Sequence, residues 1–289
     1  MAIKSYKGFD KNLRCRDFQY KIGGIYEMDG EIKVCSRGFH ACESPFDVFD
    51  YYTMIDSRFC EVEQDGNISK EDRRTKICSS KIKIKTELKL ADMINLGIEW
   101  LKEITLPEKI KTSIKDNSSG NYAQIGSSGD GAKIGSSGNN AQIGSSGNNA
   151  KIGSSGDGAK IGSSGYDAKI GSSGYDAQIG SSGNNAQIGS SGNNAKIGSS
   201  GDGAKIGSSG NNAKIDSTGK DCVIMCAGIN SVAKASKGSW ITLSEWSYSE
   251  GKQRYIPICV KTEFVDGEKI KADTYYSLKG GVFVEWIND

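Results

Sequence analysis

The only histidine of the chain, His40, lies between two of its eight cysteines, Cys35 and Cys42. A structural zinc site needs four ligands, usually with short Cys-x-x-Cys spacings, and the sequence contains no such spacing. We therefore expect no metal, and we interpret the cysteines as reduced, partly buried thiols of a cytosolic protein. His40 is interpreted as a structural residue rather than as a catalytic base.

Residues for covalent or phosphate chemistry do not occur in recognisable spacings. The sequence has no Gly-rich phosphate loop, no Ser-x-x-Lys, no paired catalytic carboxylates and no nucleophile elbow. We predict no catalytic residue and no cofactor.

Regularly spaced lysines are the residues best suited to binding. A repeated outward position in the middle of the chain is Lys or Gln, and with two repeats per coil these residues form two rows. The first row contains Lys133, Lys151, Lys169 and Lys205, interrupted by Gln187, and the second contains Lys160, Lys196 and Lys214 among glutamines. Such rows could follow phosphates or an acidic protein surface. Alternatively, they only keep a flat sheet soluble and prevent edge-to-edge association.

Two tyrosines, Tyr166 and Tyr175, occupy otherwise polar turn positions in neighbouring repeats. They are either aromatic anchors of an interface or tolerated turn residues. The partner that we expect is a host protein or a protein–nucleic acid complex, with weak contact between the lysines and a phosphate backbone.

The elements that position these lysines come from a nine-residue repeat between Ala123 and Asp221. Ala-Lys-Ile alternates as a short strand with Ala and Ile inward, and Gly-Ser-Ser-Gly with the following pair supplies turn residues. Two glycines in every nine residues exclude a helix. We predict a mainly β protein whose centre is a parallel β-solenoid with two repeats per coil and five to six coils.

The solenoid is predicted at residues 116–221, between a domain at 1–115 and another at 222–289 that cap its ends. The N-terminal part is predicted to be an α+β domain, with strands at 32–34, 59–63 and 81–85 and helices at 45–52 and 90–104. The C-terminal part is predicted to be β-rich, with strands at 240–243, 256–260 and 282–286.

The nonapeptides resemble the calcium-binding rolls of secreted bacterial toxins, whose pattern is Gly-Gly-x-Gly-x-Asp-x-apolar-x. Aligned on Gly126 and Gly129, the repeat has Ser127 for the second glycine and Gly131 at the aspartate position, where other repeats carry Asn, Gly or Asp. We therefore expect no calcium. The Ala-x-Ile-Gly strings also resemble the head rolls of trimeric adhesins, but the start of the chain lacks the apolar stretch of a secretory signal. We expect a cytoplasmic protein.

The order of the parts resembles an uncharacterised phage and bacterial family. The matching residues are Tyr6-Lys7-Gly8-Phe9, Gly38-Phe39-His40-Ala41-Cys42 and the segment from Val265 to Ile270. The resemblance covers the full chain, and it implies a mobile-element origin without supplying an activity.

A second resemblance concerns Gly38 to Gly66, whose order of motifs is similar to the nicotinamide pocket of ADP-ribosyltransferases. In that family an early Arg or His holds the NAD ribose and a late Glu polarises the acceptor. Lys7 stands at the early position here, and Glu61 and Glu63 are candidates for the late one by spacing alone. Three interpretations of the N-terminal domain stay open: a degenerate relative of that fold, a working ADP-ribosyltransferase, or an unrelated α+β cap.

A net charge of +2 gives no whole-chain argument for nucleic acid, and no run of 18 apolar residues exists to span a membrane. Our prediction is a non-catalytic interaction protein, phage- or prophage-encoded, whose rigid solenoid binds a host factor. The candidate role is inhibition of a nucleic-acid-dependent defence system such as CRISPR–Cas. The alternatives are a virion structural component and an ADP-ribosyltransferase-like enzyme.

Overall fold

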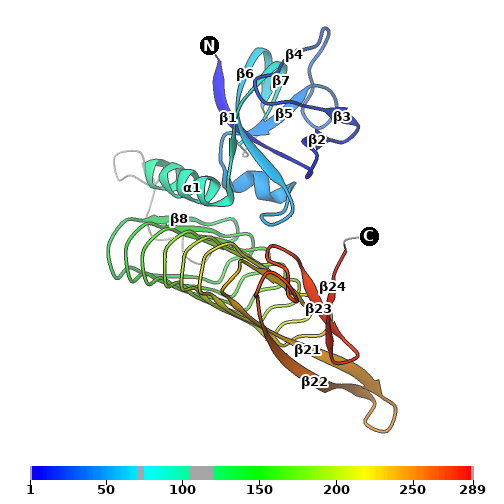
Figure 1. Cartoon of the computed structure of the whole chain (residues 1–289). Coiled ribbons are helices and arrows are strands. Elements are labelled where there is room, and N and C mark those ends of the chain that lie inside the picture. Colours follow the sequence, from blue (N-terminus) through cyan, green and yellow to red (C-terminus); the bar gives the residue numbers. More distant parts are fainter. Residues whose placement is uncertain (1, 71–74, 105–119, 288–289) are drawn as a thin grey trace. The chain divides into compact units, whose positions relative to one another are not determined.

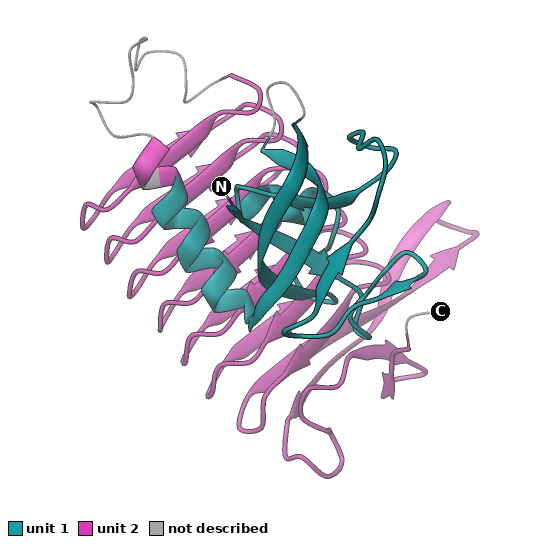
Figure 2. Cartoon of the chain, turned by 90° about the horizontal axis from the view of Figure 1, so that it is seen from above, with its two compact units in different colours: residues 1–100 teal, residues 101–289 magenta. Residues whose placement is uncertain are grey.

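A computed structural model describes residues 2–70, 75–104 and 120–287. The chain divides into two compact units, Met1–Trp100 and Leu101–Asp289, and each is described by itself (Figure 2). The boundary predicted at residues 115 and 116 lies outside the described residues.

The N-terminal unit is built on a five-stranded antiparallel sheet in the order β4-β7-β5-β1-β6. The two long strands β6 and β7 also pair with each other, so that the sheet closes on itself. Its interior contains Phe9, Val62, Ile82 and Ile84, all without exposed surface. The elements are β1 (Ile3–Phe9), β2 (Arg14–Cys15), β3 (Phe18–Gln19), β4 (Ile25–Glu27), β5 (Phe39–Cys42), η1 (Phe46–Asp50), β6 (Arg58–Lys70), β7 (Lys76–Leu88) and α1 (Leu90–Ile104).

Most predicted elements of this unit are confirmed, with two corrections. The predicted strand at 32–34 is wrong: only an isolated bridge joins Lys33 to Arg37, because Cys35 between them turns the chain at a positive φ of 64°. The predicted helix at 45–52 is a five-residue 3₁₀-helix, η1, in which the Asp47 amide donates to Ser44 Oγ at 3.4 Å. The helix predicted at 90–104 is α1, with its predicted apolar residues Met93, Ile94 and Ile98 fully buried.

The second unit contains the parallel β-solenoid, with about seven coils between residues 124 and 243 (Figure 1). The predicted number of five to six coils is too low, because the stack continues beyond residue 221. Each coil contributes one strand to each of two sheets, as two repeats per coil require. One sheet, here called the lysine sheet, has the order β22-β21-β19-β17-β15-β13-β11-β9, and the opposite sheet has the order β24-β23-β20-β18-β16-β14-β12-β10-β8.

The lysine sheet consists of β9 (Lys133–Ser136), β11 (Lys151–Ser154), β13 (Lys169–Ser172), β15 (Gln187–Ser190), β17 (Lys205–Ser208), β19 (Val223–Cys226), β21 (Trp240–Ser249) and β22 (Arg254–Phe264). The opposite sheet consists of β8 (Gln124–Ser127), β10 (Gln142–Ser145), β12 (Lys160–Ser163), β14 (Gln178–Ser181), β16 (Lys196–Ser199), β18 (Lys214–Ser217), β20 (Val232–Ala235), β23 (Tyr276–Lys279) and β24 (Val282–Glu285).

Parallel pairing without any register shift stacks identical residues on one another. Lys151 pairs with Lys133 and Lys169, and Ile152 pairs with Ile134 and Ile170 in the same strands. Alternation along each strand turns Ile inward, and the isoleucines from Ile143 to Ile224 are at most 3% exposed. The predicted inward positions are therefore confirmed, and the outward lysines of the lysine sheet are exposed. The opposite sheet differs, because its predicted outward residues Gln142 and Lys160 are buried, with 8% and 3% of their surface exposed.

The turns explain the two variable residues of each repeat. The second of them lies at positive φ, for example 57° at Asn149 and 66° at Gly158, and Gly, Asn and Asp are the residues that tolerate this region. The first is often Asn or Asp, whose side chain accepts a backbone hydrogen bond from the next coil. Asn148 Oδ1, for instance, accepts from the Tyr166 amide at 2.9 Å.

The C-terminal segment continues both sheets. Stacking passes residue 221, where the nonapeptide pattern ends, because β19 and β21 pair in parallel with the lysine sheet and β20 pairs with β18. The hairpin β21–β22 and the strands β23 and β24 then pair antiparallel at the end of the stack. The three predicted C-terminal strands lie in β21, β22 and β24. No helix in the described part of the chain has the length and apolarity to cross a membrane.

Two glycines of one repeat provide a test of the stacking. A Cβ on Gly174 would overlap the carbonyl oxygen of Gly156 in the preceding coil, whereas a Cβ on Gly171 meets nothing within 4 Å. We expect Gly174→Ala to lower the free energy of unfolding by about 1–3 kcal/mol, the usual cost of overpacking. Gly171→Ala should leave it unchanged or raise it slightly. Thermal unfolding followed by circular dichroism compares the two, and equal melting temperatures would contradict the close approach.

Candidate functional site

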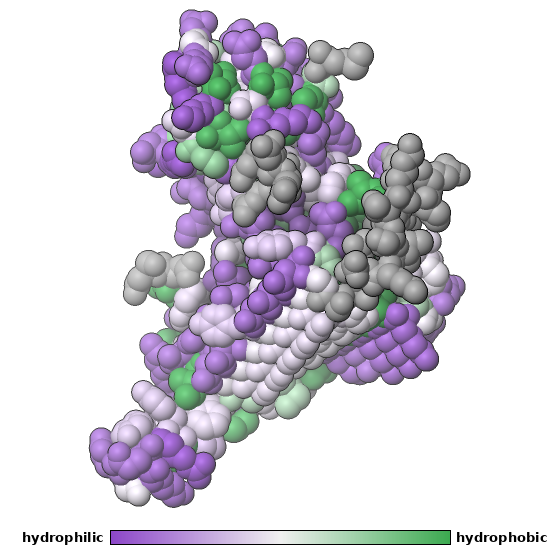
Figure 3. Space-filling model, turned by 180° about the vertical axis from the view of Figure 1, so that it is seen from behind, coloured by the Kyte–Doolittle hydropathy of each residue, from purple (hydrophilic) through white to green (hydrophobic). Residues whose placement is uncertain are grey.

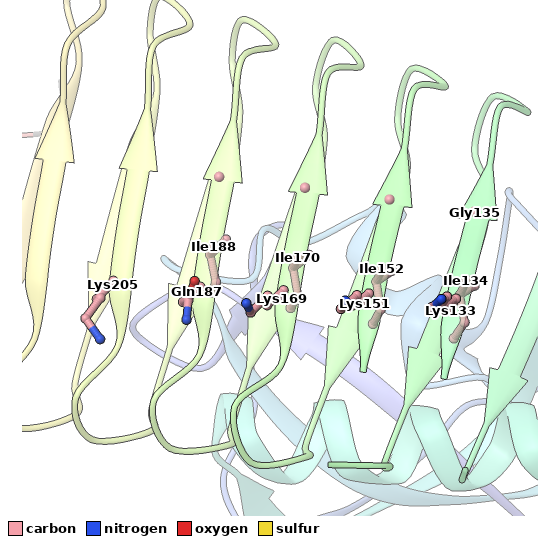
Figure 4. Close-up of a pocket in the computed structure, with 13 residues that line it drawn as sticks. Lys133, Ile134, Gly135, Lys151, Ile152, Lys169, Ile170, Gln187, Ile188 and Lys205 are labelled. Carbon is pink, nitrogen blue, oxygen red and sulfur yellow. The ribbon is translucent and has the colours of Figure 1, made fainter. Parts of the chain in front are cut away.

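The outer face of the lysine sheet forms a shallow trough of about 800 Å³. Its residues repeat in rows, with lysine or glutamine along one side and glycine along the floor (Figure 4). The lysine row contains Lys133, Lys151, Lys169 and Lys205, with Gln187 between the last two. The sequence-predicted first row is thus assembled on one face.

The trough is open because its floor has no side chains. A Cβ on the floor residues Gly135, Gly153, Gly171, Gly189 or Gly207 would meet nothing within 4 Å. An exposed serine, such as Ser155 or Ser173, follows each of the strands β9, β11, β13, β15 and β17. In the space-filling view the repeats appear as straight parallel rows of residues of like hydropathy (Figure 3).

The four lysines of this row take part in no ion pair or cation–π contact among the residues that the structure describes. Their ammonium groups repeat at the inter-strand spacing of about 4.8 Å. The row is therefore an unneutralised line of positive charge over a flat floor.

The second predicted row lies on the opposite sheet. Lys160 and Lys196 pair there with Gln178, and Lys214 pairs with Lys196. Lys160 is not the accessible binding residue that we predicted, because only 3% of its surface is exposed. Lys214 is not the free binding residue that we predicted, because its Nζ lies 4.3 Å from the ring centroids of both Tyr275 and Trp286. These cation–π contacts hold it against the C-terminal strands.

The two tyrosines do not form one aromatic patch. Tyr166 follows β12 of the opposite sheet and Tyr175 follows β13 of the lysine sheet, so they occupy turns on opposite edges of the solenoid. Both are 48% exposed, and Tyr166 Oη accepts a hydrogen bond from Asn185 Nδ2 at 2.6 Å.

A second candidate site is a pocket of about 1250 Å³ in the N-terminal unit. The two sequence motifs that carry the family resemblance meet at this pocket, because β1 and β5 are neighbouring strands of the sheet. Lys7 comes from the first motif, His40 and Cys42 come from the second, and Cys15 and Tyr52 also line the pocket. Charged residues contribute to the lining as well, among them Arg16, Asp17, Glu27, Asp50 and Lys76.

Lys7 is the most unusual residue of the pocket, since its side chain is only 4% exposed. Its Nζ donates to the His40 carbonyl oxygen at 2.8 Å and lies 3.5 Å from Cys15 Sγ. The rings of Phe9 and Tyr20 each lie with their centroids 5.5 Å from this nitrogen. Burial lowers the pKa of Lys7, and the nearby Cys15 sulfur opposes that shift.

Tyr52 lies against Cys15 from the other side. Its hydroxyl donates to Cys15 Sγ at 3.0 Å, and burial raises the pKa of the phenol, so that it stays protonated. Gly8 makes this position possible, because any Cβ there would overlap the Tyr52 ring. This contact explains the glycine of the Tyr-Lys-Gly-Phe motif.

His40 is neutral and structural, as its contacts show. Its Nε2 accepts a hydrogen bond from the Cys35 amide at 3.0 Å. Burial, followed by the charges of Lys7 and Lys76, lowers the pKa of His40 to about 4. Among the described residues, no group of three or more His, Cys, Asp or Glu side chains is arranged to hold a metal ion.

The glutamates considered for transferase chemistry lie elsewhere. Glu61 forms an ion pair with Lys4 at 2.8 Å and Glu63 forms one with Lys85 at 2.6 Å, and neither lines the pocket. The structure therefore brings Lys7 and His40 together, but not Lys7 and either glutamate.

Sequence reasoning missed Cys15 and Tyr52 as members of this site. Their contact joins residues 37 positions apart, which no spacing rule connects. The sequence did contain one signal for the site, which is Lys7 between aromatic residues in the strand Tyr6-Lys7-Gly8-Phe9. Aromatic neighbours indicate a buried strand, and a buried lysine usually has a partner nearby.

The single histidine allows a direct test of the pocket's electrostatics. By nuclear magnetic resonance we expect His40 to titrate near pH 4 in the folded protein and near the ordinary value of about 6.5 in urea. Because the unfolded state binds the proton more tightly, the contribution of His40 to stability is complete above about pH 6.5 and is lost progressively as the pH falls toward 4. Lys7→Met should raise the His40 pKa, and an unshifted value in the folded protein would contradict this environment.

Residues 3–96 match the model of a family described as "Domain of unknown function (DUF7666)". The match includes every residue named above in the N-terminal pocket, and it ends before the solenoid begins. No curated protein and no solved structure matches the chain. The N-terminal unit is thus similar to a described domain family, and that description supplies no activity.

Proposed function

We propose that the protein is a non-catalytic binding protein whose lysine sheet holds the phosphate backbone of a nucleic acid. The observation that supports this most directly is the row of four unpaired lysines over a floor without side chains. A phosphate chain laid along the solenoid axis can approach the glycine floor closely while its charges face the ammonium groups.

The geometry favours nucleic acid over an acidic peptide. An extended peptide is usually bound at a sheet edge, through backbone hydrogen bonds and pockets for alternate side chains. The trough lies on a sheet face, whose backbone groups are already used in the parallel ladder, and its glycine floor has no such pockets. Exposed serines beside the floor can donate to phosphate oxygens, which is a common contact to nucleic acids.

The dimensions set the expected strength of binding. Four coil steps separate Lys133 from Lys205, which is about 19 Å at about 4.8 Å per step. About six phosphates of one strand of a duplex span this length. With no aromatic residue among those lining the trough, base stacking does not contribute, so binding should be independent of sequence and strongly dependent on salt.

A phage- or prophage-encoded protein with this surface would compete for nucleic acid with a host defence complex, such as CRISPR–Cas. This role is suggested by the resemblance to phage and bacterial proteins that we inferred from the sequence motifs, and inhibition of target cleavage by a reconstituted complex would test it.

Binding to a short labelled DNA duplex at several salt concentrations tests the lysine row. Lys151→Gln with Lys169→Gln introduces residues that the repeat itself uses at Gln187, so the fold should be preserved. The slope of log K against log salt is negative, and we expect its magnitude to fall by about 1.8, or about 0.9 per lysine. Gln187→Lys, which fills the gap in the row, should increase the magnitude of the slope by about 0.9 and tighten binding.

The matched control is Lys252→Gln, which removes the same charge from the exposed turn between β21 and β22. It should change the slope far less than either substitution in the row. If Lys252→Gln changes the slope as much as a substitution in the row, or if Gln187→Lys leaves the slope unchanged, the lysine row is not the binding site. Stronger, row-dependent binding of polyglutamate than of DNA would assign the face to an acidic protein and overturn the nucleic acid proposal.

A further inference from the structure

The N-terminal pocket contains a buried lysine without a carboxylate partner. None of the ion pairs of the described residues involves Lys7, and its Nζ has only the His40 carbonyl and Cys15 Sγ as hydrogen-bond partners there. A buried ammonium without an anion is unfavourable by several kcal/mol. The arrangement therefore calls for an explanation beyond stability.

We propose that Cys15 is a nucleophile, that Lys7 is its general base, and that the pocket takes small electrophiles carrying an aromatic ring. The required geometry is a nucleophile and a base within reach of each other, with the base oriented by a third group. Cys15 Sγ, Lys7 Nζ and the His40 carbonyl oxygen form this series, at 3.5 and 2.8 Å.

The hydrogen bonds around the pair support proton transfer from sulfur to nitrogen. The His40 carbonyl only accepts, so it stabilises the ammonium that forms on Lys7. The Tyr52 hydroxyl donates to the sulfur at 3.0 Å, so it stabilises the thiolate that forms on Cys15. Before and after the transfer the pair is neutral overall, which avoids burial of a net charge.

The other thiols differ from Cys15 in access or in partners. Burial raises the pKa of Cys42, Cys60 and Cys226 to about 12 and that of Cys78 to about 11, so these four thiols are unreactive. Cys15 is half-buried and lines the pocket. Cys35 is exposed on the same pocket, with Lys76 Nζ at 3.2 Å, and it serves as the internal comparison.

Aromatic side chains indicate the class of ligand. Phe18, Tyr20, Tyr26 and Phe39 line the pocket, and their rings meet at centroid distances of 4.8 to 6.5 Å. Phe18 is 46% exposed, so its ring is accessible to a further aromatic group. Such contacts favour offset or edge-to-face stacking with a ring on the ligand.

The covalent step can be written with a chloroacetamide. The sulfur of Cys15 forms a bond to the methylene carbon, chloride leaves with the bonding pair, and the thiol proton passes to Lys7. The Lys7 ammonium, now without its partner, releases that proton to water. The titratable groups that surround the pair are Asp10, Arg16, Tyr20, Tyr26, His40, Cys42 and Tyr52.

The experiment measures alkylation of each cysteine in the full chain by mass spectrometry, with 2-chloroacetamide and with N-benzyl-2-chloroacetamide. We expect Cys15 to react at least tenfold faster than Cys35, although Cys35 is the more exposed. The benzyl compound should react faster than its parent at Cys15 and not at Cys35.

Two variants separate a chemical role from a structural one. Lys7→Met should lower the Cys15 rate at pH 7 by tenfold or more and leave the Cys35 rate unchanged. Tyr52→Phe, which removes one hydroxyl, should lower the rate several-fold at an unchanged circular dichroism spectrum and leave Cys35 unaffected. If Cys15 reacts no faster than Cys35, or if Lys7→Met leaves the Cys15 rate unchanged, the proposal is wrong. If the benzyl compound reacts with Cys15 no faster than its parent, the proposal of an aromatic ligand is wrong.

Discussion

Parallel hydrogen bonding between residues 18 positions apart is the interaction on which the solenoid depends. Each strand donates to and accepts from the strands one coil before and one coil after, and the turns do the same through Asn and Asp side chains. The close approach of glycines at the turns permits this spacing, because a Cβ there would overlap the preceding coil. Isoleucine burial alone would not offset the conformational entropy of so many ordered residues. The ladder therefore has to be continuous.

The continuous ladder also produces the row of lysines on the outer face of the lysine sheet. When register never slips, each outward residue type forms a straight row, and a chain of nearly neutral net charge acquires a local line of lysines. The N-terminal unit has no such rows. Its closed antiparallel sheet instead brings single residues from distant segments around one pocket. One unit thus offers a repeated surface and the other offers a unique cluster.

The repeat made the solenoid predictable, because strand length, inward and outward positions and turn residues recur in every copy. The end of the stack was less predictable, since β19 and β20 keep the coil while Val223, Met225 and Val232 replace the repeat residues. Trp286 and Tyr275 reach back to Lys214 from a segment without any repeat, so this contact left no signal in the sequence. The Lys7 pocket depends on sheet closure, and only the motifs on β1 and β5 indicated it beforehand.

The pairing of two nonapeptides per coil constrains how the length of this protein can change in evolution. Gain or loss of eighteen residues adds or removes one complete coil and keeps every later residue on its own side of the rod. Gain or loss of nine would exchange the two faces for all following repeats, so the lysine line would break and continue on the reverse side. It would also present the C-terminal strands to the wrong sheet. Related proteins can therefore differ in the length of the solenoid and keep the same C-terminal strands only if nonapeptides are gained or lost in even numbers.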